Sequence, residues 1–342
     1  MRVRQMIFVT VSVLAMCTLF MYLLREEEPT YTSKKLVQGI IDRSNQVGNN
    51  LTLARDKLDD MVVNENDIVS VAKRVSKHNG TVLVTMINDA YLSFTYSWLC
   101  NTKDMDIHKS VLIITTDESS KTKLTRDWPD VTVFSMDMTG SKGDQTYSHA
   151  GYVRIMVKRT EMLLAILMAD LEIFVFEVDC LWLANPTPLL QQEKSYDILA
   201  NPVEGVVKTY AGGFLYLFTT DKAKRLWKRV TEMMVSLGEK LDKMKEDTYI
   251  SEADNDQQYL TRLINTKYEG IAVKELSLET YADGKWYGKS PEERNKLHPL
   301  VINNNWVLGN QKKIERAKEW KHWFIREDWS CDMDLVRKTV YH

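Results

Sequence analysis

Short apolar runs of strand length alternate with helical stretches between residues 80 and 176. We expect strands at residues 81–87, 110–116, 131–135 and 171–176, separated by helices at residues 91–101, a polar helix that ends at Trp128, and a helix at residues 152–170. This alternation predicts a mainly parallel α/β sheet with helices on both faces. Such sheets bind ligands beyond the carboxyl ends of their strands. Asn88, Asp117 and Glu177–Asp179 should therefore gather along one edge.

The second half of the chain is less regular. Gly212 and Gly213 begin an expected strand that ends at Phe218 and is entered through a tight turn. The other expected elements are helices at residues 220–243, 255–265 and 310–323 and a short strand at residues 300–303. Hydrophobic residues make up 44% of the 342, enough for a full core. The 45 Lys and Arg nearly balance the 47 Asp and Glu, so there is no basic footprint for nucleic acid.

The amino terminus carries an uncharged apolar run, Met6–Leu24. As a helix it would be about 28 Å long, close to the thickness of the hydrocarbon core of a bilayer. Arg2 and Arg4 precede it and three glutamates, 26–28, follow, so the positive-inside rule predicts a type II signal anchor. A cleaved signal peptide is the alternative, but its apolar core is shorter and ends in small residues.

This topology divides the chain into four parts: a cytoplasmic tail (1–5), a transmembrane signal anchor (6–24), a partly helical lumenal stem (25–78) and a catalytic body (79–342). The short span suits thin membranes of the early secretory pathway, and we expect a Golgi location. A homodimer through the stem stays open. Sequons at Asn50 and Asn79 predict N-glycosylation. Cys100, Cys180 and Cys331 would be lumenal, so at most one disulfide forms within the chain and its pairing is open.

Two acids one residue apart, Glu177 and Asp179, follow the last strand of the alternating region. Residues i and i+2 point the same way in extended chain, so both carboxylates can face one ligand. Paired carboxylates suit a hard divalent cation, which in turn can hold a diphosphate. The spacing alone is common by chance. The position of this pair at the end of a buried strand distinguishes it from the others.

The segment 176–186 resembles the metal-binding segment of the nucleotide-diphospho-sugar transferase family, glycosyltransferases of the GT-A fold. The likeness extends over residues 80–325 through several blocks in the same order. These are residues 81–88, Arg159-Thr160, Gly212-Gly213-Phe214, Asp256-Gln257 and Asn305–Gly309 with Lys313. The resemblance implies a GT-A-like, Rossmann-type sheet. It also implies transfer of a hexose or pentose from a nucleotide-diphosphate sugar, UDP being favoured, to a glycan or glycoprotein acceptor.

The resemblance also implies roles for individual residues. Asp179 would bind Mn²⁺ or Mg²⁺ directly, and Glu177 would face the ribose or a metal-bound water. The nucleotide-sugar contacts would come from Asn88, Arg159, Glu177, Gly213, Gly309 and Lys313, with Lys312 as an alternative to Lys313. Asp256 and Gln257 would line the sugar and acceptor side as catalytic residues. The likeness is to retaining transferases.

Two departures from the family pattern bear on the metal. Glu177 stands where an Asp is usual, and Asn303 stands where a His usually completes the metal shell. An amide oxygen can still ligate a hard cation, with less affinity than an imidazole. A catalytically silent relative that binds glycans or partners is therefore the alternative, and an unrelated membrane-anchored adhesion protein is a third.

Several residues near these motifs have simpler interpretations. Trp306, Trp320, Trp323 and Trp329 are expected to pack in the core rather than stack on sugars. His149 is expected to be a surface or core residue rather than a base. Asp117 and Asp256 each stand where a helix is expected to begin, so each could be a helix cap instead of a ligand-binding residue.

Overall fold

The computed structural model describes residues 67–136, 138, 142–203, 205 and 208–340. The predicted tail, the anchor at 6–24, Asn50 and most of the stem lie outside these residues. Within the described part of the chain, no helix is both long and apolar enough to cross a bilayer. Asn79 is described, and its side chain is exposed, as glycosylation of this sequon requires.

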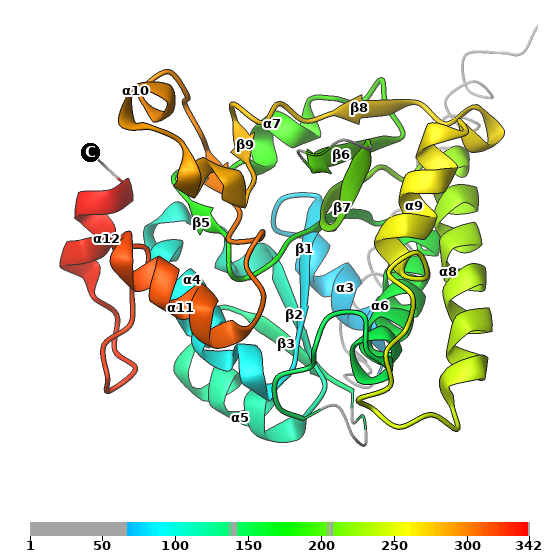
Figure 1. Ribbon diagram of the computed structural model, residues 1–342, viewed down its shortest axis with the longest axis horizontal. Coiled ribbons are helices and arrows are strands. Elements are labelled where there is room, and N and C mark those ends of the chain that lie inside the picture. The colour runs from blue at the N-terminus through cyan, green and yellow to red at the C-terminus, as the bar shows by residue number, and fades with distance from the viewer. Residues whose placement is uncertain (1–66, 137, 139–141, 204, 206–207, 341–342) are drawn as a thin grey trace, which may run out of the picture. The chain divides into compact units, whose positions relative to one another are not determined.

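A seven-stranded sheet forms the centre of the described unit (Figure 1), in the order β3-β2-β1-β4-β7-β6-β8. Strands β3, β2, β1 and β4 are parallel, and β7 runs antiparallel to both of its neighbours. The strands of this sheet are β1 (Thr81–Ile87), β2 (Val111–Thr115), β3 (Thr132–Ser135), β4 (Glu172–Val175), β6 (Ile198–Val203), β7 (Thr209–Leu217) and β8 (Val273–Glu275). A second sheet contains β5 (Leu181–Trp182), β10 (Val301–Ile302) and β9 (Tyr281–Ala282).

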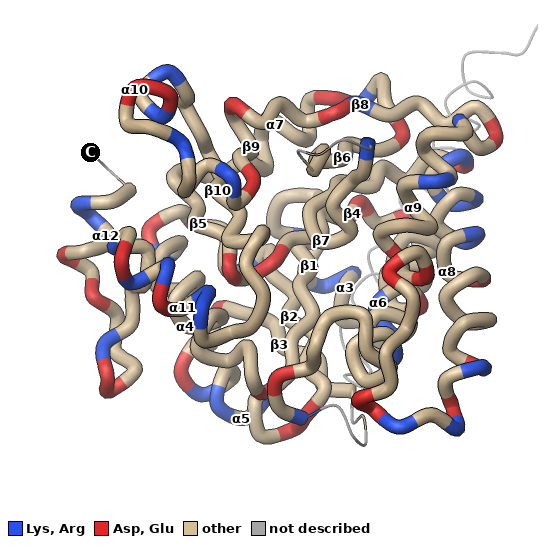
Figure 2. The backbone as a smooth tube through the Cα atoms, viewed as in Figure 1, with Lys and Arg blue, Asp and Glu red and all other residues tan. Residues whose placement is uncertain are grey.

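Helices cover both faces of the large sheet because its strands are apolar on both sides. Alternate residues of β1 point to opposite cores: Val82 and Val84 belong to one cluster of buried residues and Leu83 to the other. The first face carries α3 (Ile68–Ser76), α6 (Ala150–Met168), α8 (Asp221–Leu241) and α9 (Asp256–Asn265). The second carries α4 (Leu92–Asn101) and α5 (Glu118–Asp127). Figure 2 shows charged residues of both signs on α5 and α8 and none along β1 or β2.

The smaller elements lie mainly in the second half of the chain. They are α7 (Thr187–Gln191), α10 (Pro291–Arg294), α11 (Asn310–Glu319) and α12 (Met333–Val340). A disulfide joins Cys100 at the end of α4 to Cys331, 231 residues later, whereas Cys180 is a buried free thiol. The sequence allowed at most one disulfide among these three residues, and the pairing that it left open is Cys100 with Cys331.

Helix α3 changes the expected start of the folded body. It lies within residues 25–78, which the sequence analysis assigned to the stem. Its residues Ile68, Val71, Ala72 and Val75 are buried in the main core. The helix is capped by Asp67, whose carboxylate accepts hydrogen bonds from the amides of Val69 and Ser70. The folded unit therefore includes residues that precede the expected boundary at 79.

The glycine pair at 212–213 is also placed differently from the expectation. The strand expected to begin at Gly212 and Gly213 is present, but it starts earlier than expected: both glycines lie inside β7, which begins at Thr209, and not at a tight turn that leads into it. The expectation of a turn was wrong because these glycines serve close packing instead. A Cβ on Gly213 would stand 2.4 Å from the carboxyl carbon of Glu177.

Candidate functional site

The parallel strands end together and bring polar residues to one edge of the sheet. Ile87 of β1 pairs with Thr115 of β2, and Val84 pairs with Val175 of β4. Residues that follow these strands therefore meet at the same level. A cavity of about 110 Å³ opens there, and Asn88, Arg159, Glu177 and Asp179 line it. The expected gathering of Asn88 with the two acids is confirmed.

Asp117 follows β2 at this edge but serves another purpose. Its carboxylate accepts hydrogen bonds from the Ser120 amide, at 2.8 Å, and the Ser119 hydroxyl, at 2.7 Å. It is the N-cap of α5. Of the two interpretations left open by the sequence, the structure supports the helix cap.

Glu177 reaches across the site to the residue that stands in the usual place of a histidine. The Asn303 amide donates a hydrogen bond of 3.1 Å to Oε2 of Glu177. The glutamate side chain lies against the bare Cα of Gly213, where an added Cβ would come within 2.4 Å of Oε1. Burial, and then repulsion from Asp179, raise the pKa of Glu177. The two departures from the family pattern thus contact each other directly.

Asp179 is paired with a lysine from a distant part of the chain. Nζ of Lys313 lies 2.6 Å from Oδ2 of Asp179, and their side chains are 17% and 2% exposed. Burial alone would lower the pKa of Lys313, but attraction to Asp179 and other groups raises it above its usual range. Lys312 is exposed. Of the two lysines considered from the sequence, Lys313 is the one that faces the acids.

Gly309 explains how Lys313 reaches this position. It has φ of 88°, a left-handed conformation that glycine adopts without strain, and it is the N-cap of α11. Lys313 lies in the first turn of that helix, where its amide donates to the Gly309 carbonyl at 3.2 Å. The turn at Gly309 therefore places both a lysine and a helix N-terminus near the acids, an arrangement that suits an anion.

The residues expected on the sugar side form a second buried group. The Arg159 guanidinium makes an ion pair with Asp256 and donates to the Gly212 carbonyl at 3.3 Å. Oε1 of Gln257 accepts a hydrogen bond of 3.3 Å from the backbone amide of Gly212. The N-cap of α9 is Asn255, whose side chain accepts from the Gln258 amide, so capping does not account for Asp256. In this structure Arg159 is paired with Asp256. The contact of Arg159 with the diphosphate stays a prediction.

The oxygen atoms around Glu177 fit a hard cation. Among the described residues, Oδ1 of Asp179 and Oδ1 of Asn303 are both buried and lack a hydrogen-bond partner. An unpaired buried oxygen costs about 1–3 kcal/mol, which a cation would offset. Two carboxylates and an amide oxygen are a ligand set for Mg²⁺ or Mn²⁺ rather than for zinc. The described residues contain no cluster of three or more His, Cys, Asp or Glu suited to a metal.

Several residues of this site were not predicted from the sequence. Tyr91 and Tyr152 line the cavity. The side-chain amide of Asn88 donates a hydrogen bond of 2.7 Å to the Gly143 carbonyl, so the loop that contains Gly143 lies against the site. The sequence held two signals for these tyrosines. Tyr91 closely follows Asn88. Tyr152 precedes Arg159 by seven residues, which places Tyr152 and Arg159 on the same face of a helix.

Residues that the sequence analysis set aside are also located. His149 precedes α6, and its Nδ1 lies 3.0 Å from the Tyr147 carbonyl oxygen. Trp320 and Trp323 are partly buried. Trp306 and Trp329 are 52% and 44% exposed, so core packing was the wrong expectation for these two. Both have positive φ, 62° and 68°, and both lie outside the regular elements.

Comparisons with known proteins agree with this geometry. The sequence profile described as nucleotide-diphospho-sugar transferase matches residues 106–317, more than half of the chain. UDP-D-xylose:L-fucose alpha-1,3-D-xylosyltransferase 1 of Arabidopsis thaliana is 24% identical over 75% of this chain and 74% of its own length. Beta-arabinofuranosyltransferase RAY1 of the same plant is 22% identical over 73% of this chain and 49% of its own.

A solved structure of the galactosyltransferase LgtC, in complex with donor and acceptor sugar analogues, also aligns with this chain. The sequence identity is 14%, the alignment covers 73% of this chain and 99% of that chain, and the TM-score is 0.42.

Proposed function

The chain belongs to the nucleotide-diphospho-sugar transferase family, and from this premise we propose that it transfers a sugar from a UDP-sugar to a hydroxyl of a glycan or glycoprotein acceptor. The family assignment makes it a nucleotide-sugar-dependent glycosyltransferase. The identity of the nucleotide, sugar and acceptor belongs to the proposal. The relatives are named for xylose and arabinofuranose transfer, which places UDP-pentoses first among the donors to test.

The observation that carries the proposal is the pairing of Asp179 with Lys313 beside Glu177 and Asn303. When the bond between the sugar C1 and the diphosphate oxygen breaks, its electron pair stays on the departing nucleoside diphosphate. The acceptor oxygen bonds to C1 and gives up its proton. Negative charge therefore grows on the diphosphate, and Lys313 with the N-terminus of α11 would stabilise it.

A divalent cation is part of the proposal. Asp179 and Asn303 would hold it through their unpaired Oδ1 atoms, with Glu177 beside them. Bound there, Mn²⁺ or Mg²⁺ would add positive charge where the leaving diphosphate becomes negative. Lys313 would then release Asp179 and turn toward the diphosphate.

The sugar side of the proposal rests on Asp256 and Gln257. Asp256 is buried and held by Arg159, so the direction of its side chain is fixed before substrate arrives. Gln257 is held by the Gly212 amide. These two side chains would orient the transferred sugar, and the resemblance to retaining enzymes makes retention the expected stereochemical outcome.

The cellular setting is proposed on separate grounds. The apolar segment Met6–Leu24 would anchor the chain as a single-pass type II protein of the Golgi membrane with the catalytic body in the lumen. A disulfide between Cys100 and Cys331 suits an oxidising compartment.

The function is tested with the full chain purified in detergent. UDP release is measured from UDP-xylose, UDP-arabinofuranose, UDP-galactose and UDP-glucose, with Mn²⁺ and with a chelator, and the anomeric configuration of the product is read by NMR. We expect turnover of one UDP-pentose that Mn²⁺ stimulates. No turnover of any donor, together with no rise in melting temperature in the presence of UDP, would favour the catalytically silent relative.

A further inference from the structure

A second, larger cavity lies at the opposite edge of the sheet from the transfer site. Its volume is about 830 Å³, within the range of ligand sites. His108 lies just before β2 and Trp128 just before β3, so its walls stand at the amino ends of strands. The transfer site stands at the carboxyl ends. A five-residue strand such as β2 spans about 17 Å, so the two sites are separate.

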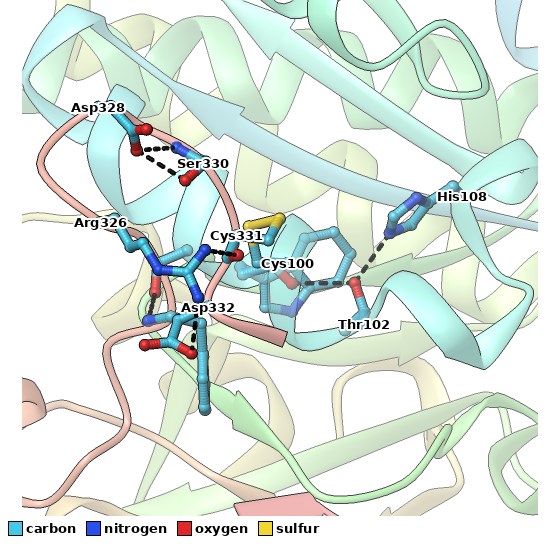
Figure 3. The surroundings of a disulfide bond; sticks show 11 residues. Cys100, Thr102, His108, Arg326, Asp328, Ser330, Cys331 and Asp332 are labelled. Carbon is cyan, nitrogen blue, oxygen red and sulfur yellow. Dashed lines mark hydrogen bonds and ion pairs between the residues drawn. A yellow bond between two sulfur atoms is a disulfide. The ribbon is translucent and has the colours of Figure 1, made fainter. Parts of the chain in front are cut away.

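A braced loop forms one wall of this cavity. Residues 325–331 fold back through a β-bridge between Ile325 and Cys331, and the disulfide ties Cys331 to α4 (Figure 3). Arg326 donates to the Cys331 carbonyl at 2.9 Å, and the Ser330 hydroxyl donates to Asp328 at 2.6 Å. With this many local bonds the loop is held in one shape before any ligand arrives, which reduces the entropy lost on binding.

Trp329 lies at the tip of this loop in an unfavourable backbone conformation. Its φ of 68° is unfavourable for a bulky residue by about 1–2 kcal/mol. Its side chain is nevertheless 44% exposed, so burial does not compensate for the strain. The ring of Tyr96 packs against it edge to face at a centroid distance of 5.0 Å. Strained residues of this kind are concentrated at ligand-binding sites.

The charges of the cavity indicate what kind of ligand it takes. Its walls carry three acids, Asp127, Asp130 and Asp328, against three bases, Lys103, Lys123 and Arg126. Burial lowers the pKa of His108 to about 4, so it is neutral near pH 7. A site for a phosphate or another anion would carry an excess of bases. These walls are balanced and rich in hydrogen-bonding groups, which suits an uncharged ligand with many hydroxyls.

We propose that this cavity binds an uncharged oligosaccharide, with one sugar ring lying on Trp329 and its hydroxyls bonded by the surrounding carboxylates and bases. The choice of a glycan as ligand rests in part on the proposed transferase function, whose acceptor is itself a glycan. A glycan held here would stay attached to the enzyme, so a chain long enough to reach the carboxyl ends of the strands would present its free end to the transfer site at a raised local concentration.

Binding is tested on the full chain in a zwitterionic detergent, because a detergent with a sugar headgroup would compete. The probes are cellohexaose, xylohexaose and an arabinohexaose, with hexagalacturonate as the charged counterpart, and binding is measured by calorimetry and tryptophan fluorescence. We expect at least one neutral probe to bind, Trp329→Ala to weaken it about tenfold, and Trp329→Tyr to retain most of the affinity. Tyr249→Ala, an exposed aromatic residue elsewhere, is the matched control and should change nothing.

Three results would overturn the proposal. One is failure of every neutral probe to bind an enzyme that still hydrolyses its donor. Another is tight binding of hexagalacturonate alone, which would indicate an anion site. A third is a dimer in sedimentation that dissociates in Trp329→Ala, which would make the tip a contact between copies. Donor hydrolysis without acceptor should be unchanged in Trp329→Ala, so loss of the glycan site and loss of the transferase function are distinguishable. Melting curves establish that each variant is folded.

Discussion

Replacing Gly213 with alanine should disable the enzyme without unfolding it. The added Cβ would stand 2.4 Å from both Cδ and Oε1 of Glu177. Carbon atoms in contact are normally about 3.5 Å apart, so the carboxylate has to move by about 1 Å. A movement of that size is enough to break its 3.1 Å hydrogen bond with Asn303. Misplacement by about 1 Å in an active site lowers kcat/KM roughly 100-fold, which is the loss we expect.

Stability should change much less than activity. The atoms in the way belong to the end of a flexible side chain, not to the backbone, so β7 can keep its place. Overpacking of this kind costs about 1–3 kcal/mol, and we expect the lower end. The assay is UDP release from the best donor, beside a urea melt of the same preparation. Gly212→Ala is the matched control, because its Cβ would meet neighbours only at 3.2–3.3 Å and should cost several-fold less activity.

A double-mutant cycle decides whether the effect passes through the carboxylate. If Gly213→Ala acts only by displacing Glu177, it should add almost nothing in an enzyme that already carries Glu177→Ala. Two results would refute the reasoning: unchanged kcat/KM in a folded Gly213→Ala enzyme, or fully additive losses in the double variant.

Three further predictions concern other parts of the described chain. Lys313→Met should lower kcat/KM by about 10²–10³, because it removes the charge that faces the leaving diphosphate. Lys312→Met should keep a kcat/KM near that of the wild type. Equal effects of the two substitutions in UDP-release assays would contradict the assignment of Lys313 to the diphosphate. Cys331→Ser should lower the free energy of unfolding by about 2–5 kcal/mol in a urea melt, since the Cys100–Cys331 bond closes a sequence separation of 231 residues; an unchanged midpoint would exclude this bond. Burial holds the pKa of His108 near 4, below about 6.5 in the unfolded chain, so its contribution to stability is complete above pH 6.5 and is lost as the pH falls toward 4. The loss at pH 5 is about 2 kcal/mol and should shrink in His108→Gln; an identical pH dependence in the variant would contradict the assignment.

Much of the sheet could be predicted because its strands are buried on both faces. The expected strand at residues 81–87 matches β1, and the other expected strands of the first half agree within about two residues with β2, β3 and β4. The expected helices between them also agree with α4, α5 and α6 within about two residues. The parallel arrangement of these strands was enough to predict that Asn88, Glu177 and Asp179 lie close together.

The short elements of the second half could not be predicted in the same way. β5 and β9 are two residues long, too short to show a period, and they exist because each pairs with β10, which the expected strand at residues 300–303 did predict. β6 begins at Ile198 and β8 at Val273, and both went unrecognised because their partners are distant in the sequence. The sequence likewise could not show that Lys313, rather than Lys312, reaches Asp179, since that depends on the turn at Gly309.

The exposed tryptophans show another limit of sequence reasoning. A tryptophan is a good core residue, so burial was the sensible expectation for Trp306 and Trp329. Each instead has positive φ and is about half exposed. No local pattern of apolar residues carries that information.

The most direct measurement of the central claim is UDP release by Asp179→Ala beside the wild-type chain, with the best UDP-sugar and saturating Mn²⁺. The account predicts that the wild type turns over and that the variant, folded by its melting curve, loses activity by a factor of about 10² or more. An Asp179→Ala enzyme that kept full activity would show that sugar transfer does not take place at this edge of the sheet.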